Sequence, residues 1–479
     1  MSEIKGKKKI IRDISANTAQ IVITQTFGLA IFYFTSKFLR KTDFGEFNWC
    51  LAVGSTIIAL ASLGLDLVFV KKVAIGKNIL LISGLHFFHT IFVAVVLGFT
   101  ALIFRQFIPG FTVSHPLFFL IFVNLALANI ANSFKLCLNG LEEYRKLASL
   151  AMIANFLKFS IIIFLYLSNN FTIFSIIIAY GITSITEFVA GYFLLGNSLS
   201  ARIKPVVKLM EYKYFIIESL PQLGVVLFDS ALARIDWILL GVLASATVTA
   251  EYSFAYRIFE LSKLPILIIA PVLLTRFSKL FAGEKAATTK YLDDINTFFK
   301  IEFFVVMIIP LMLLSCWTPL IDYLTDNKYG VVNEINYRLL GFCIPLACVI
   351  NFLWTLAFVQ GQLKIILYIT IAVSTVNVLL NLVLIPVYSG LGASAAFLVS
   401  TALQIILYYK YTNQTHIKIN VSGLGILFLS ALFAFAAASF LPVHFIVKPF
   451  IAVIFYFLLV MATRQIDLKK LKHILRKTE

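Results

Sequence analysis

Apolar residues form fourteen long stretches along the chain, each about as long as a helix needs to be to cross the hydrocarbon core of a bilayer. Polar residues inside several stretches recur at three- and four-residue spacing, which indicates helices and not strands. The predicted spans cover residues 13–38, 44–69, 79–104, 116–139, 147–168, 172–195, 214–242, 250–278, 298–321, 336–359, 363–386, 391–411, 421–441 and 446–463. This pattern predicts an all-α polytopic membrane protein with about fourteen transmembrane helices, or twelve if the last two stretches form a hairpin.

The composition supports this fold class and excludes several functions. Hydrophobic residues make up 60% of the 479 positions and charged residues 13%, with a mean hydropathy of +0.95. Few residues remain between the spans, which leaves no room for an ATPase domain or an extracellular catalytic domain. The chain also lacks the phosphate-binding pattern Gly-x-x-x-x-Gly-Lys-Ser/Thr and the hydrolase and zinc-protease signatures. We expect no catalytic residues and no cofactor, so any transport would be secondary or downhill.

Positive charge is distributed unequally between the two sides of the predicted membrane. Lys and Arg number 40 against 23 Asp and Glu, which gives a net charge of +17. If the N-terminus is cytoplasmic, 27 of these cations fall in cytoplasmic segments and 7 in the opposite loops. The positive-inside rule therefore predicts that both termini are cytoplasmic. Because the charge follows membrane topology, we expect no nucleic-acid partner.

Two weak sequence matches relate the first half of the chain to the second. Glu46-Phe47 matches Glu251-Tyr252, and the pair Gly140 and Asn155 matches Gly361 and Asn377. Each match joins a span to the span six places later, which predicts two parallel six-helix lobes with a substrate cleft between them. The alternative is that apolar helices resemble one another by composition alone. The predicted parts are a basic N-terminus 1–12, lobes 13–200 and 214–412, a linker 201–213, an extra helix pair 413–463 and a basic amphipathic tail 464–479.

Ionisable residues inside the spans are the main functional signal. Thirteen such residues, six basic and seven acidic, cannot all face lipid, because each central charge costs about 2.5–3.5 kcal/mol on insertion scales. Glu218, Gln222, Asp229 and Asp236 form one stripe on the seventh span, within about 40° of each other around the helix. The eighth span carries Arg257, Glu260 and Lys263, and we expect an ion pair between Arg257 and Asp236 because they lie at similar depths.

Amides and cations of this kind suit a phosphorylated sugar, because amides bond to hydroxyl groups and cations neutralise phosphate oxygens. Asn124, Asn132 and Lys135 share a face of the fourth span. The alternative is that such polar stripes only join neighbouring helices. The predicted substrate contacts are Arg257, Lys135, Lys263, Asn124, Asn132, Gln222 and Arg234, and the groups predicted to orient cations or bind a coupling ion are Asp229, Asp236 and Glu260.

Two histidines raise the question of a metal site. His86 and His89 lie three residues apart in the third span, so they share a helix face. No carboxylate stands near them in the sequence to complete a metal site. We therefore predict interfacial or packed histidines and no bound metal.

Several short motifs together carry a resemblance to a known family. They are Asp43-Phe44-Gly45-Glu46-Phe47, Leu63-Gly64-Leu65-Asp66, the Asn139-Gly140 loop with Tyr144, Ala233-Arg234-Ile235-Asp236 and Tyr252-Ser253-Phe254-Ala255-Tyr256-Arg257. Over essentially its whole length the chain resembles bacterial polysaccharide-biosynthesis flippases, including the O-antigen and capsule repeat-unit flippases of the multidrug/oligosaccharidyl-lipid/polysaccharide exporter superfamily.

This resemblance implies 14 helices in two lobes and a place in the bacterial inner membrane. It also implies alternating-access transfer of an undecaprenyl-diphosphate-linked oligosaccharide from the cytoplasmic to the periplasmic leaflet. The expected partners are this polyprenyl-diphosphate-linked glycan, the lipid bilayer, and a polymerase and chain-length regulator of the same pathway. The family's cationic lumen is not established here, because the in-span charges are nearly balanced.

Three other functions remain open at this point. A lipid II flippase or a multidrug exporter of the same superfamily would have the same architecture. An integral-membrane polysaccharide polymerase or ligase belongs to a different class. Asp322 and Asp326, in the longest outer segment, could form the acidic pair of such an enzyme, or could belong to an ordinary polar turn.

Overall fold

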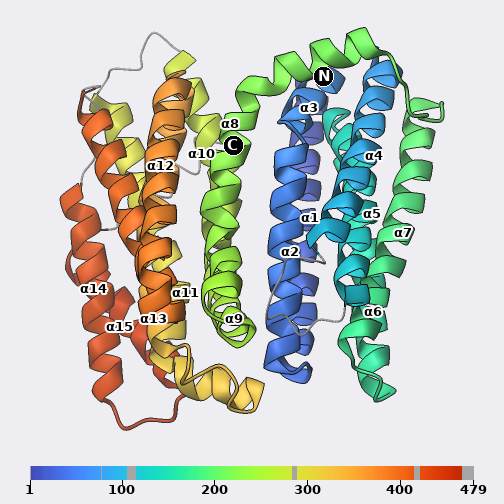
Figure 1. The fold of residues 1–479 in the computed structure, drawn as a ribbon. Helices are drawn as coiled ribbons and strands as arrows, with labels where there is room; N and C mark the ends of the chain where they lie inside the picture. Colours follow the sequence, from blue (N-terminus) through green and yellow to red (C-terminus); the bar gives the residue numbers. More distant parts are fainter. Residues whose placement is uncertain (1, 77, 105–114, 283–288, 415–420, 466–479) are drawn as a thin grey trace. The chain divides into compact units, whose positions relative to one another are not determined.

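The computed structural model describes residues 2–76, 78–104, 115–282, 289–414 and 421–465 (Figure 1). All regular secondary structure in these residues is helical, and ten of the described helices are long and apolar enough to cross a membrane. The prediction of an all-α polytopic membrane protein is therefore confirmed. The chain forms two compact units, residues 1–250 and 251–479.

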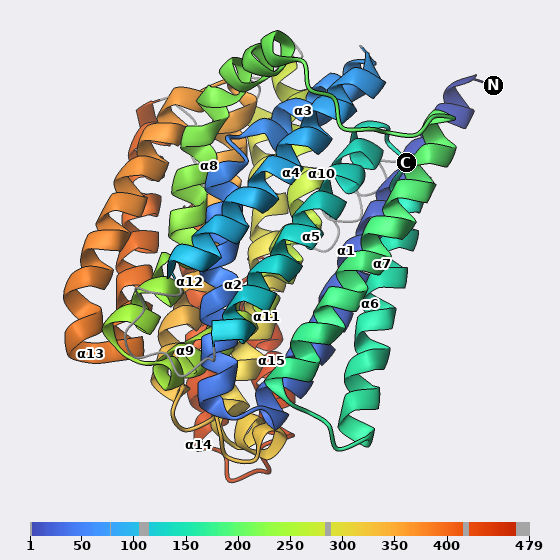
Figure 2. The same cartoon turned by 45° about the vertical axis from the view of Figure 1, so that its right-hand side comes forward.

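The first unit contains eight helices and the beginning of a ninth among the described residues. Helix α1 packs against α6, α5 lies between α4 and α7, and α2 packs against α8. Figure 2 shows α1, α6 and α7 side by side, and Figure 1 shows α8 crossing the ends of α3 and α4 before it changes direction. The helices are α1 (Ser2–Phe38), α2 (Lys41–Ala61), α3 (Leu65–Ile75), α4 (Ile79–Phe104), α5 (His115–Gly140), α6 (Tyr144–Leu167), α7 (Ile173–Leu199) and α8 (Leu209–Leu243).

The second predicted span, residues 44–69, is not one helix. Helix α2 ends at Ala61 and α3 begins at Leu65. Between them Leu63 and Gly64 have φ angles of 52° and 73°, in the left-handed region that glycine adopts without steric cost. A Cβ atom on Gly64 would lie 2.8 Å from the backbone N of Leu223, because α8 packs directly on this break. The break and the position of α8 therefore depend on each other.

A hydrophobic core joins α3, α4, α5 and the first part of α8. Its fully buried members include Phe69 of α3, Phe134 and Leu138 of α5, and Phe215 of α8. In a bilayer these side chains gain little by leaving lipid, which is as apolar as they are, so close van der Waals packing between the helices stabilises this core. This core holds the polar residues of α4 and α5 in fixed positions.

The second unit contains α9 from Glu251 onward and the helices that follow it. Helix α12 packs against α10, α11 and α13, and α15 packs against α11 and α14. Its helices are α9 (Ala246–Ser262), α10 (Leu264–Ala282), α11 (Thr289–Thr325), α12 (Glu334–Val359), α13 (Leu363–Gln414), α14 (Val421–Phe440) and α15 (Lys448–Ala462).

Two interruptions of helices occur in this unit. One divides a predicted span, and the other lies in a predicted gap between spans. The predicted span 250–278 divides at Lys263, and Pro265 lies in the first turn of α10, where a helix tolerates a proline. Helix α13 runs through the predicted gap between residues 386 and 391, but Ser389 is non-helical there, with φ 52° and ψ −128°. Residues 466–479 of the predicted tail lie outside the described residues.

The close approach at Gly45 generates a stability prediction. A Cβ atom there would lie 1.8 Å from the carbonyl oxygen of Ala246, so Gly45→Ala must displace backbone. We expect the free energy of unfolding to fall by about 1–3 kcal/mol, the usual cost of overpacking. Thermal unfolding of the purified chain in detergent measures the change.

Gly98→Ala is the matched control, because a Cβ atom on Gly98 of α4 meets no described atom within 4 Å. This variant should be at least as stable as wild type, since alanine is the better helix former. Equal melting temperatures for the two variants would contradict the close approach.

Candidate functional site

Three charged side chains of the first unit meet inside the helical bundle. Lys135 of α5 donates a hydrogen bond from Nζ to Oε1 of Glu187 on α7, at 3.1 Å. Lys158 of α6 interacts electrostatically with both residues, and its Nζ lies 4.3 Å from the centre of the Tyr180 ring. Lys135, Lys158 and Glu187, called the cationic cluster below, combine two positive charges with one negative charge.

The side chains of the cationic cluster are partly buried. The side chains of Lys135 and Glu187 are 30% and 18% exposed. Partial burial strengthens their attraction relative to a surface pair, while their exposed parts stay accessible to an incoming group. The excess positive charge suits an anionic ligand such as a phosphate, and Glu187 keeps the Lys135 ammonium in place.

Helix α5 also carries the two predicted amides. Asn124 donates from Nδ2 to the carbonyl oxygen of Ile177 on α7 at 2.6 Å, and its Oδ1 lies against Gly181. Asn124 therefore joins α5 to α7, as the alternative interpretation of the polar stripes expected. Asn132 is half-buried, three residues before Lys135 and so on a neighbouring position of the same face.

The stripe predicted on α8 passes through different environments along the helix. Glu218 forms an ion pair with Lys72 at 2.6 Å. The Cβ atom of Gln222 lies against Gly64 at the α2–α3 break. Asp236 is 2% exposed and accepts the backbone N–H of Trp237 on Oδ1.

Two further residues predicted on α8 complete this comparison. The guanidinium carbon of Arg234 lies 4.6 Å from the ring centre of Trp237, a distance typical of a cation–π contact. The side chain of Asp229 lies outside the described residues.

The three residues predicted on the eighth span lie in the second unit. Arg257 donates from Nη1 to Oε2 of Glu260 at 2.9 Å, within α9. Lys263 Nζ lies 4.3 Å from the centre of the Phe259 ring, where α9 ends. The expected pair between Arg257 and Asp236 would join the two units and stays a prediction.

Sequence reasoning missed the partner of Lys135. Lys158 and Glu187 are two of the thirteen ionisable residues within the predicted spans, but the sequence does not connect them with Lys135. The available signal was the presence of opposite charges near the middle of consecutive helices, where each charge needs a partner. The sequence does not say which of several charges would meet.

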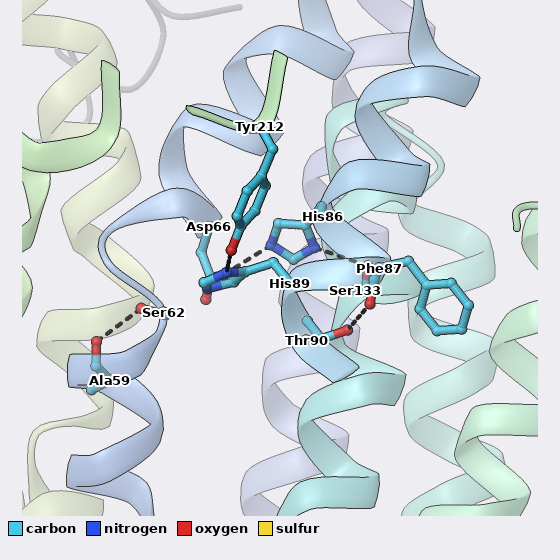
Figure 3. Close-up of polar contacts among 9 residues, drawn as sticks. All are labelled: Ala59, Ser62, Asp66, His86, Phe87, His89, Thr90, Ser133 and Tyr212. Atoms are coloured by element: carbon cyan, nitrogen blue, oxygen red, sulfur yellow. Dashed lines mark hydrogen bonds and ion pairs between the residues drawn. The ribbon is translucent and has the colours of Figure 1, made fainter. Parts of the chain in front are cut away.

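The prediction that no carboxylate lies near the two histidines is wrong. A carboxylate does stand beside them, because α3 packs along α4 and places Oδ1 of Asp66 3.1 Å from Nε2 of His86 (Figure 3). His86 and His89 are both buried, as predicted. Within the described parts of the chain, no group of three or more His, Cys, Asp or Glu is placed to hold a metal ion.

Comparison with known proteins adds the family. Residues 10–281 match the model of a family described as polysaccharide biosynthesis protein, which is more than half of the chain. A search of curated proteins gives no match.

Solved structures with a similar fold are transporters. The structure of the lipid II flippase MurJ in an inward closed conformation has a TM-score of 0.75 at 12% identity, covering 94% of this chain and 98% of that one. A multidrug resistance MATE family transporter in an inward-facing conformation has a TM-score of 0.64 at 14% identity, with coverages of 83% and 98%. A MOP superfamily transporter from Pyrococcus furiosus has a TM-score of 0.59 at 12% identity, with coverages of 88% and 96%.

At these identities the structural similarities establish the fold alone, whereas the family match rests on the sequence itself. The chain belongs to the polysaccharide biosynthesis protein family, and its fold is similar to the folds of the lipid II flippase and the transporters named above.

Proposed function

We propose that the chain is a flippase of the bacterial cytoplasmic membrane, with both termini in the cytoplasm. It moves an undecaprenyl-diphosphate-linked oligosaccharide from the cytoplasmic to the periplasmic leaflet by alternating access. The product serves the synthesis of O-antigen or another surface polysaccharide, with a polymerase and a chain-length regulator as partners in the pathway. Family membership supports the substrate class, and the cationic cluster is the observation that carries the proposal.

The charge of the cationic cluster fits the head of such a substrate. A diphosphate is anionic and can accept hydrogen bonds from Lys135 and Lys158, while the polyprenyl tail stays in lipid. Amide groups such as that of Asn132 can exchange hydrogen bonds with sugar hydroxyls. Because the cluster has one more cation than anion, it favours an anionic headgroup over a cationic drug.

A lipid II flippase is the second candidate, because the structure of MurJ has a similar fold over nearly the whole chain. Both candidate substrates are lipid-linked saccharides that carry a diphosphate, so the cationic cluster suits either. Depletion separates them: loss of a lipid II flippase would be lethal, whereas loss of a surface-polysaccharide flippase would strip the surface polymer.

The leaflet in which intermediates accumulate tests the function itself. In a deletion strain we expect lipid-linked repeat units to be trapped in the cytoplasmic leaflet, because synthesis continues while transfer stops. The measurement is protection of these glycans from a membrane-impermeant oxidant in spheroplasts, before and after lysis.

A plasmid copy of the chain should restore access to the oxidant in intact spheroplasts. If the trapped units were already accessible without the plasmid, the chain would act after transfer, as a polymerase or ligase does.

Charge removal at the cationic cluster tests the site. We expect Lys158→Ala to lower surface glycan about tenfold or more at equal protein level, because a charge-assisted hydrogen bond contributes about 1.5–3 kcal/mol. Lys135→Arg should retain part of the activity, since arginine keeps both the charge and the bond to Glu187. Quantitative blotting of surface glycan measures both effects.

Lys146→Ala is the matched control on the same helix. Lys146 also pairs with a carboxylate, Glu143 at 3.5 Å, but it lies in the first turn of α6, away from the cationic cluster. This variant should keep wild-type glycan. Equal losses in Lys146→Ala and Lys158→Ala would remove the special role of the cationic cluster.

The remaining assigned charges have a separate test. Arg257→Ala and Asp236→Ala should each reduce surface glycan, because Arg257 is assigned to the substrate and Asp236 to the orientation of cations. Asp236 is buried, so the amount of membrane-inserted protein is measured alongside. Wild-type glycan in both variants would show that these two assignments are wrong.

A further inference from the structure

Two buried histidines of α4 connect four elements of the first unit. His86 contacts Asp66 of α3 through Nε2 at 3.1 Å and Ser133 of α5 through Nδ1 at 2.9 Å (Figure 3). Its ring also stacks on Phe69, with centres 4.1 Å apart. Both ring nitrogens of His86 therefore have polar partners, although the side chain is only 1% exposed.

His89 lies one helical turn further along α4 and faces the break between α2 and α3. Its Nδ1 is 2.8 Å from the hydroxyl of Tyr212, in the first turns of α8. Its Nε2 is buried and has no hydrogen-bond partner at normal distance among the described residues. The backbone of Ala61 and Ser62, where α2 ends, lies on that side of the ring.

The end of α2 is a suitable place for a positive charge. The last carbonyl groups of a helix have no partner within the helix and carry the negative end of its dipole. An N–H on Nε2 of His89 points to this end. A second proton on the ring would strengthen the attraction, because it adds a full positive charge beside these carbonyls.

The partners of both rings accept either protonation state. A hydroxyl can donate or accept, so Ser133 and Tyr212 can each face a bare ring nitrogen or an N–H. The carboxylate of Asp66 accepts from an N–H in both states. Adding a proton therefore does not require the polar partners to move apart.

The charge balance of this region limits it to one proton. Asp66 of α3 is the carboxylate that faces the rings, and the other titratable groups facing them are the two histidines themselves and Tyr212 of α8. Helix α5 contributes Ser133, with Cys137 one turn away against Ser83, and α2 contributes backbone. The nearby Lys72 is paired with Glu218. One added proton is balanced by Asp66, whereas a second would place two positive rings one turn apart.

Asp66 is the most exposed side chain of this region. It is 39% exposed, whereas the His86 side chain bonded to it is 1% exposed. Of the three side chains, Asp66 is therefore the one that an entering proton would meet first.

The region also bears on the position of α8. Tyr212 connects the first part of α8 to His89, and further along α8 the Cβ atom of Gln222 lies 2.8 Å from where a Cβ atom on Gly64 would be. The α2–α3 break thus lies between His89 and α8. Helix α8 is the last complete helix of the first unit and leads to the second unit.

We propose that Asp66, His86 and His89 form a binding site for a single proton, and that the bound proton fastens the start of α8 to the α2–α3 break. This site is additional to the cationic cluster and to the ion-coupling residues predicted from the sequence. In transport, this site would make the movement of α8 depend on pH, and that role rests on the proposed function. Binding of the proton does not depend on the proposed function.

Hydrogen exchange of the purified full chain in lipid nanodiscs tests the proposal without any substrate. Amides of residues 58–66 are compared at pH 5.5 and pH 8, after correction for the pH dependence of chemical exchange. We expect exchange about tenfold slower at pH 5.5, as suits a protonated histidine at a part-buried helix C-terminus. His89→Gln and Asp66→Asn should lose this difference.

His444→Gln is the matched control, because His444 is an exposed histidine of the second unit, before α15. It should keep the full difference between the two pH values. If His89→Gln does not fold, Asp66→Asn alone tests the proposal, because Asp66 is partly exposed and its replacement disturbs the core less. Tyr212→Phe should reduce the difference in exchange between the two pH values, because it removes the hydrogen bond from His89 to α8.

Equal exchange at both pH values in the wild-type chain would overturn the proposal, and so would an unchanged difference in Asp66→Asn. Because the measurement needs no substrate, it separates this proposal from the flippase assignment. A pH-dependent break in a chain that moves no lipid-linked glycan would leave the proton site in place and remove only its role in transport.

Discussion

The low polarity of a bilayer interior is the constraint on which the other features of this chain depend. A charged side chain there requires an opposite charge, an aromatic face or access to water. The described structure supplies such partners: Lys135 bonds to Glu187, Arg257 bonds to Glu260, and Lys158 lies over the ring of Tyr180. In the cationic cluster, where cations exceed carboxylates and the side chains stay partly exposed, the remaining positive charge is the proposed contact for the substrate.

The same constraint acts on the backbone where helices are interrupted. At the α2–α3 break the N–H groups of Ser62 and Leu65 still find carbonyl partners, on Ile58 and Ser62. The helical ladder of α2 does not continue past Ala61, and the buried imidazole of His89 lies near the backbone of Ala61 and Ser62. Interrupted helices at membrane depth are tolerated only when neighbouring groups satisfy the freed backbone. The backbone at such a break can shift when the charge of the neighbouring side chain changes, whereas an intact helix is held by its own hydrogen bonds.

Helix α5 connects the two polar regions of the first unit. Ser133 faces His86, and Lys135 faces Glu187. Two residues along a helix correspond to about 200° of rotation, so these side chains point to nearly opposite sides. The buried core around Phe134 and Leu138 fixes the helix between them. A movement of α5 relative to α4 would therefore affect the proposed phosphate contact and the proposed proton site together.

Apolar periodicity, charge distribution and short motifs were enough to predict the helical membrane fold, most span positions and the family, because each depends on local sequence. The sequence also located the in-span charges, since any charge within an apolar stretch is conspicuous. Only the tertiary structure decided which charges meet: Glu187 with Lys135, and Asp66 with His86, which lie 52 and 20 residues apart. It also decided that Asn124 joins two helices and that the second span is broken. Side-chain partners follow from how helices rotate and pack against one another, and a single helix pattern does not contain that information.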